Sequence, residues 1–215
     1  MPVGQGGKSK LTLYHRPSAK TMPLLTKSKG VTLVISAQSV EEQVIDIERL
    51  CRKAGIKHFH LDLRGANQAL LDDAKVQKRI RVRLAELFSI LSDNEEKAVL
   101  HCSAGIHRTG TMAYTLIRMS NPELSGSDAY AALKTMREDT HKGVGDWRIE
   151  LAERHFVAYF QQHGIATVKA EVVETEVTKE EKEEEVKKVE GTKEDAQAAE
   201  DGLKEEVKFD EDGSK

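Results

Sequence analysis

The sequence predicts an α/β fold in which a central, mostly parallel sheet is flanked by helices. Short apolar runs alternate with longer amphipathic segments in the order strand, helix, strand, helix, strand. This order favours parallel strands with helices on both faces of the sheet. The last strand leads into the loop 101–110, and a helix follows at once. Loops at the carboxyl ends of parallel strands are the usual ligand sites of such sheets.

The first predicted strand and helix lie between residues 31 and 51. Residues 31–35 are rich in β-branched side chains, as strands are. Ser39 suits the N-cap of a helix. That helix places four side chains on one face, namely Val44, Ile47, Leu50 and Cys51. Residues 12–22 are ambiguous because Pro17 and Pro23 punctuate them, so we expect residues 1–30 to be a partly ordered N-terminal segment.

The following elements complete the predicted sheet and its helices. Residues 57–63 alternate between apolar and polar side chains, which is typical of a strand. A long amphipathic helix follows, with Val76, Ile80, Leu84, Leu87 and Leu91 on its apolar face. The apolar run 98–100 predicts a buried strand, and 111–118 predicts the helix after the loop. A last helix is expected to bury Leu151, Phe156 and Tyr159.

Composition divides the chain into a folded body and a charged tail. Residues 169–215 carry 18 acidic and 9 basic side chains, so residues 1–168 have a net charge of +6 in a chain of net charge −3. The tail has too few apolar residues to fold alone, and we expect it to be disordered or loosely helical. One folded domain is therefore expected over 31–168. The acidic tail either contacts this basic domain, in competition with anionic substrates, or is merely solvated.

Cysteine usage and hydropathy indicate the compartment. The chain has two cysteines and no apolar segment long enough to span a membrane. We therefore expect an intracellular protein, cytoplasmic or nuclear, in a reducing environment. Cys51 is either a core residue or a disulfide partner of Cys102. No second pair of Cys or His stands at ligand spacing, so we expect neither a metal nor a cofactor.

The loop 101–110 reads His-Cys-Ser-Ala-Gly-Ile-His-Arg-Thr-Gly, and it carries the chemistry. Its main-chain N–H groups can curl around an anion, and the dipole of the following helix adds to their field. The same field stabilises a thiolate, which makes Cys102 a candidate nucleophile with a lowered pKa. The planar fork of Arg108 can grip two phosphate oxygens.

Other loop positions have narrower expected roles. Thr109 can donate its hydroxyl to the Cys102 sulfur, and His101 can brace the loop from behind. The phosphate is expected to contact the residues between the cysteine and the arginine, which are Ser103, Ala104, Gly105, Ile106 and His107. Gly105 suits an unusual backbone conformation. His107 either touches the substrate or covers the loop.

This stretch resembles the signature of the cysteine-dependent protein tyrosine phosphatase superfamily, His-Cys-x5-Arg-(Ser/Thr). The short folded body resembles the compact dual-specificity type. The resemblance implies a three-layer phosphatase fold and hydrolysis of phosphomonoesters through a phosphocysteine intermediate. Phosphotyrosine, phosphoserine and phosphothreonine in a phosphoprotein are the expected substrates, with no stable nucleic-acid partner. The alternatives are phosphoinositides, RNA 5′-phosphates, or a pseudophosphatase that only binds phosphorylated partners.

The resemblance also implies an Asp, upstream of the cysteine, that protonates the leaving group. Asp72 and Asp73 stand 30 and 29 residues before Cys102, and Asp72 is preferred. Either could instead cap the long helix, and Asp62 is a third candidate. Asn67 could also occupy the position of the acid, which would favour substrates with good leaving groups.

For the second chemical step, relatives position a water with a side chain on a later loop. Residues 143–148 fall in that region of the sequence. Asp146 either positions the water or caps a helix. Trp147 either forms a wall of the pocket or fills the core.

Overall fold

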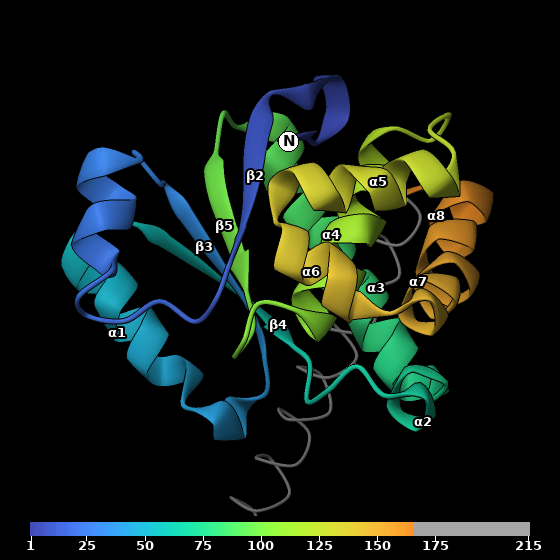
Figure 1. The fold of residues 1–215 in the computed structure, drawn as a ribbon, viewed down its shortest axis with the longest axis horizontal. Coiled ribbons are helices and arrows are strands. Elements are labelled where there is room, and N and C mark those ends of the chain that lie inside the picture. Colours follow the sequence, from blue (N-terminus) through green and yellow to red (C-terminus); the bar gives the residue numbers. More distant parts are fainter. Residues whose placement is uncertain (166–215) are drawn as a thin grey trace, which may run out of the picture. The chain divides into compact units, whose positions relative to one another are not determined.

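A computed structural model describes residues 1–165 and contains a five-stranded sheet between helical layers (Figure 1). The strand order is β1-β2-β5-β3-β4, and only the pairing of β1 with β2 is antiparallel. The strands are β1 (Pro2–Val3), β2 (Ser9–Tyr14), β3 (Leu33–Gln38), β4 (Lys57–Asp62) and β5 (Lys97–His101). The predicted α/β class with a mostly parallel sheet is confirmed.

One face of the sheet is covered by α1 (Val44–Ala54) and by η2 (Leu24–Ser28), a single π-helical turn (Figure 1). The side chains packed in this layer are Met22, Leu25, Val31, Val34, Ile47, Cys51 and Val99. Cys51 is thus a core residue, and both cysteines are free thiols.

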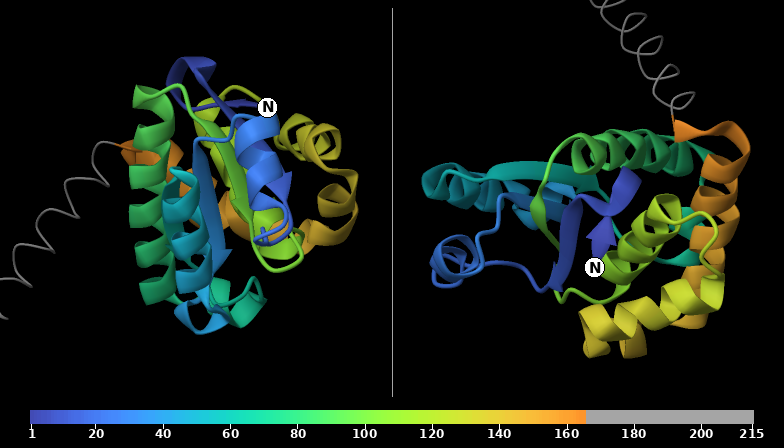
Figure 2. Two further views of the ribbon diagram at one scale, coloured as in Figure 1. Left: turned by 90° about the vertical axis from the view of Figure 1, so that its left-hand side faces the viewer. Right: turned by 90° about the horizontal axis from the view of Figure 1, so that it is seen from above.

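The other face is covered by a larger set of helices (Figure 1). They are α2 (Gln68–Leu71), α3 (Ala74–Asp93), α4 (His107–Ser120), α5 (Gly126–Met136), α6 (Glu138–Val144), α7 (Asp146–Ala152), η4 (Glu153–Val157) and α8 (Ala158–His163). The predicted apolar face of α3 is confirmed, because Ile80, Leu84, Leu87 and Leu91 are buried and Val76 is half-buried. Almost every side chain of α4 after its first turn is buried, since α4 packs against the sheet, α3, α5 and α6 (Figure 2).

The N-terminal residues belong to the sheet. β2 lies between β1 and β5, and Leu11 and Leu13 on β2 are buried in the core. The compact unit therefore begins at Met1, whereas the expected domain began at residue 31. The alternation Lys10-Leu-Thr-Leu-Tyr14 is a strand signal, but the prolines that follow it led to the later boundary.

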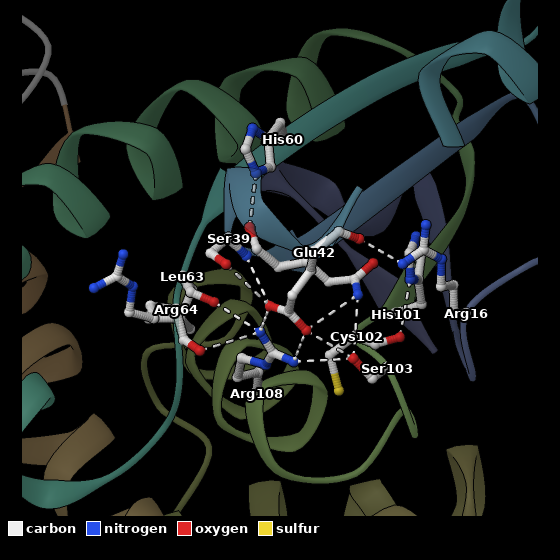
Figure 3. A network of polar contacts seen from close by, with 11 residues as sticks. Arg16, Ser39, Glu42, His60, Leu63, Arg64, His101, Cys102, Ser103 and Arg108 are labelled. Atoms are coloured by element: carbon white, nitrogen blue, oxygen red, sulfur yellow. Dashed lines mark hydrogen bonds and ion pairs between the residues drawn. The ribbon is translucent and has the colours of Figure 1, made fainter. Parts of the chain in front are cut away.

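The helix expected from Ser39 is interrupted. Val40–Glu42 form a single 3₁₀ turn (η3), Gln43 is left-handed with φ 57° and ψ 41°, and α1 begins at Val44. The Ser39 N–H donates to the Glu42 carboxylate at 2.9 Å, as in a helix cap. The break lets Glu42 face the loop after β5 instead of continuing along α1 (Figure 3).

The expected acidic tail, 169–215, lies outside the described residues. Within residues 1–165, no helix is both long and apolar enough to cross a membrane.

Leu13 offers a test of whether β2 is part of the core. We expect Leu13→Ala to lower the free energy of unfolding by about 2–5 kcal/mol, because it leaves a cavity in a buried layer. Thr12→Ala, at the exposed neighbouring position, should change it by less than about 0.5 kcal/mol. Chemical denaturation measures both. Equal stability of the two variants would contradict the placement of β2.

Candidate active site

The loop 102–106 joins β5 to α4 at the carboxyl edge of the parallel strands (Figure 1). Cys102 follows β5 directly, and only 4% of its surface is exposed. α4 begins at His107, four residues earlier than expected, so Arg108 and Thr109 lie in its first turn. The first turn of a helix leaves main-chain N–H groups without partners inside the helix. These donors are therefore available to an anion held by the loop.

The loop carbonyls are bound from outside the loop. Arg137 Nη1 donates to the carbonyls of Ala104 at 3.0 Å and Gly105 at 2.9 Å. Thr140 Oγ1 donates to the same Gly105 carbonyl at 2.7 Å, and the Arg16 N–H donates to the Ser103 carbonyl at 3.0 Å. Because C=O and N–H point in opposite directions in a trans peptide, carbonyls held outward turn the following N–H groups inward.

Gly105 is required by two constraints. Its φ is +73°, in the left-handed region that favours glycine. A Cβ at this position would also lie 2.1 Å from the Tyr14 carbonyl oxygen. The end of β2 therefore lies in direct contact with the loop, and only glycine fits at position 105.

The environment of Cys102 favours the thiolate. Burial opposes ionisation, but hydrogen bonds from the Thr109 hydroxyl and from the N–H groups of Thr109 and Ile106, with the charge of Arg108, outweigh it. Together they lower the pKa of the Cys102 thiol below its ordinary value. The Thr109 hydroxyl is buried and bonded to no nitrogen or oxygen among the described residues, so it is available to the sulfur.

Arg108 is held by a carboxylate that the sequence alone does not identify. Both oxygens of Glu42 pair with the guanidinium, the Nη2 contact at 2.8 Å (Figure 3). Arg108 Nη1 also donates to the Leu63 carbonyl at 2.9 Å. The hydrogen bond from Arg108 lowers the pKa of Glu42 well below its usual range. Glu42 and the Leu63 carbonyl thus hold Nη1 and Nη2 of Arg108. These contacts fix the orientation of the guanidinium plane and so of its remaining N–H groups.

Ser103 connects the same carboxylate to the loop. Its hydroxyl donates to Glu42 Oε1 at 2.8 Å and accepts from Arg108 Nη2 and Gln38 Nε2, each at 3.2 Å (Figure 3). The sequence places Glu42 in the helix expected after the Ser39 cap and assigns it no role in the site. In the sequence Glu42 stands three residues after Ser39, which suits a helix start. Its partner Arg108 stands 66 residues away, so no local pattern points to this pair.

The three expected proton donors each have a partner outside the loop. Asp73 caps α3, because its carboxylate accepts from the N–H groups of Lys75 and Val76, and these bonds lower its pKa. Asp72 pairs with His155 Nε2 at 2.8 Å. Asp62 lies 3.6 Å from Arg79 Nη1. Within the described part of the chain, none of the three carboxylates forms a hydrogen bond or an ion pair with residues 102–108.

The later loop expected over 143–148 is instead the junction of α6 and α7 at Gly145, and it lies against the loop 102–106. A Cβ on Gly143 would fall 2.6 Å from the Ile106 side chain. Burial, with the charges of Arg148 and Arg108, lowers the pKa of His107. Asp146 is the first residue of α7 but forms no capping hydrogen bond; with burial, its charge raises the pKa of Tyr130, whose hydroxyl donates to the His141 carbonyl at 3.1 Å. Trp147 is 39% exposed, so it does not fill the core, and Arg148 stacks on its ring at 4.1 Å.

Residues 1–165 contain no cluster of three or more His, Cys, Asp or Glu side chains that could hold a metal ion.

Glu42 has a natural control in its neighbour, the exposed Glu41, which pairs with Arg64. We expect Glu42→Gln to lower the free energy of unfolding at pH 7 by about 1–3 kcal/mol, because Arg108 loses its charged partner. Glu41→Gln removes only an exposed ion pair, so the free energy of unfolding should stay close to that of the wild type. A carboxylate with a lowered pKa stabilises the fold above its unfolded pKa and loses this effect as the pH falls. The cost of Glu42→Gln should therefore shrink below about pH 4. Denaturant titrations at both pH values measure this, and a cost independent of pH would contradict the ion pair.

Comparison with known proteins identifies the family. The family model for protein-tyrosine phosphatase matches residues 31–146. The core catalytic domain of the PP-IP phosphatase SIW14 from S. cerevisiae, in complex with citrate, is similar with a TM-score of 0.52 and 13% identity, covering 75% of this chain and 87% of that one. The PTP-2 phosphatase of Cydia pomonella is similar with a TM-score of 0.50 and 18% identity, covering 67% and 84%. No curated protein sequence matches significantly. The chain belongs to the protein-tyrosine phosphatase family.

Proposed function

We propose that the protein hydrolyses phosphomonoesters through a phosphocysteine intermediate on Cys102. One observation carries this proposal: a buried cysteine with a lowered pKa lies beside an arginine whose fork is anchored from behind. Such a thiolate is a nucleophile at neutral pH, and such an arginine binds phosphate oxygens without having to be ordered first.

In the first step the Cys102 thiolate attacks phosphorus. The S–P bond forms while the bond from phosphorus to the ester oxygen breaks, and the departing oxygen takes a proton from an acid or from water. Charge on the three equatorial oxygens is stabilised by the inward N–H groups and by Arg108.

In the second step a water attacks the phosphocysteine and gives a proton to the group that lost one in the first step, or to solvent. The S–P bond breaks, inorganic phosphate leaves, and Cys102 returns as a thiolate. The Thr109 hydroxyl, which already favours the ionised sulfur, makes the sulfur a better leaving group in this step.

We propose phosphotyrosine, phosphoserine and phosphothreonine in proteins as the substrates. Ser103, Ala104 and His107 are exposed, which suits access of a phosphate on a short side chain as well as on tyrosine. The net charge of +6 over residues 1–168 favours anionic substrates in general. Phosphoinositides and RNA 5′-phosphates are the alternatives, and SIW14 is described as a PP-IP phosphatase.

Hydrolysis of a small aryl phosphate tests the mechanism. We expect turnover by the wild type, inhibition by vanadate, no effect of EDTA, and a loss of at least about 10³-fold in Cys102→Ser, because the hydroxyl is far less nucleophilic than a thiolate. Cys51→Ser serves as the matched control and should retain activity. Equal activity in wild type and Cys102→Ser would contradict the mechanism. Phosphate binding without turnover would support a pseudophosphatase instead.

The proton donor is tested by comparing two leaving groups. We propose Asp72 over Asp73, because the lowered pKa of Asp73 leaves a smaller fraction of its carboxyl protonated near neutral pH, and a proton donor must carry its proton. Asp72→Asn should lower turnover of an alkyl phosphate by about 10²-fold or more and that of a good aryl leaving group much less. Asp73→Asn and Asp62→Asn are the controls. If none of the three changes separates the substrates, the acid lies elsewhere or the enzyme relies on good leaving groups.

A further inference from the structure

A row of polar side chains lies behind the catalytic loop, on the sheet face that α1 covers. Ser36 on β3 is the register partner of His101 on β5, and its hydroxyl lies 2.8 Å from His101 Nε2 and 2.9 Å from His58 Nε2 on β4. His101 Nδ1 lies 3.1 Å from the Cys102 carbonyl oxygen. The chain of contacts thus runs across three strands from a half-buried histidine to the nucleophile. Ser36 and His101 are both fully buried.

The proton positions in this chain follow from one fixed acceptor. A carbonyl oxygen can only accept, so His101 Nδ1 must carry the proton. Burial lowers the pKa of His101 to about 4, so the ring is neutral at physiological pH and Nε2 is an acceptor. Ser36 must therefore donate to His101 Nε2. Since its single proton is then used, Ser36 can only accept from His58, whose Nε2 must be protonated.

The last link bears directly on the sulfur. The His101 donor holds the Cys102 carbonyl toward the back of the loop. In a planar trans peptide the next N–H, that of Ser103, then points the opposite way. A Cys102 carbonyl released from His101 could turn its negative end toward the sulfur, which would disfavour the thiolate.

We infer that Ser36 and His58 are positioning residues for the nucleophile: they fix the Nδ1–H tautomer of His101, and through it the orientation of the Cys102–Ser103 peptide. The inference rests on the proposed role of Cys102, but its readout is the thiol itself and needs no turnover. Failure of hydrolysis and failure of this inference are therefore separate results.

Other charged groups also face this chain. Glu48 on α1 and His60 on β4 act on His58, while Arg16 and Arg108 act on His101. His60 is the matched control for His58. It projects from the same strand at the spacing of side chains on one face, but its Nε2 contacts the Gln38 carbonyl and not Ser36.

The primary test is the pH dependence of Cys102 alkylation by iodoacetamide. Cys51 does not interfere, because burial raises its pKa to about 11. We expect Ser36→Ala and His58→Leu to raise the thiol pKa by about one unit, which slows alkylation about tenfold well below that pKa. Ser36→Thr keeps the hydroxyl and should restore the wild-type value.

Two isosteric changes at His58 distinguish the donor from mere bulk. Gln places an N–H near the position of Nε2 and should restore the wild-type thiol pKa, whereas Asn places it near Nδ1 and should not. His60→Leu should leave the thiol pKa unchanged. A thiol pKa that does not move in Ser36→Ala or His58→Leu, or that moves equally in His60→Leu, would overturn the inference.

A measurement on the unaltered protein covers the case in which Ser36→Ala does not fold. Long-range ¹H–¹⁵N correlation spectra report which imidazole nitrogen carries the proton. We expect the Nδ1–H tautomer for His101 and the Nε2–H tautomer for neutral His58. The reverse assignment at His101 would overturn the inference without any substitution.

Discussion

The site depends on the outward binding of the loop carbonyls. A main chain that wraps an anion must turn several N–H groups inward, and this leaves the corresponding carbonyls in need of partners elsewhere. Arg137 and Thr140 supply the partners of residues 104 and 105, and the main chain at Arg16 supplies that of Ser103. Without these partners, the carbonyls behind the loop would be unsatisfied and the peptides would not stay turned with their N–H groups inward. The electrostatic field of those N–H groups, which lowers the pKa of Cys102, would then be weaker.

The partners of the loop carbonyls come from segments far apart in the chain. Several elements packed around β5 are therefore needed to hold the loop. The end of β2 presses on Gly105, the break between η3 and α1 turns Glu42 toward Arg108, and the start of α6 supplies Thr140. Each element contributes one or two hydrogen bonds of modest net energy. Their combined effect is a loop whose N–H groups already face inward, so the proposed phosphate site would not have to be ordered by its substrate.

The parts of the site that could be predicted are those encoded locally. Cys102, Arg108 and Thr109 lie within one short stretch, and the amphipathic face of α3 follows from spacing alone. Glu42, Ser36 and His58 could not be found in this way, because each acts on a partner that only strand pairing or chain reversal brings near. The register of β3 between β5 and β4 sets these contacts. From the sequence, Asp73 is either the proton donor or the cap of the long helix. The hydrogen bonds that it accepts at the start of α3 support the cap.

The central claim is that the folded loop holds Cys102 as a thiolate near neutral pH. It is tested most directly by titrating the ultraviolet absorbance of the thiolate in the wild type and subtracting the titration of Cys102→Ser. We expect a difference curve with a midpoint clearly below the ordinary cysteine pKa of about 8.5. A midpoint at or above that value would show that burial outweighs the loop field, and it would contradict this claim.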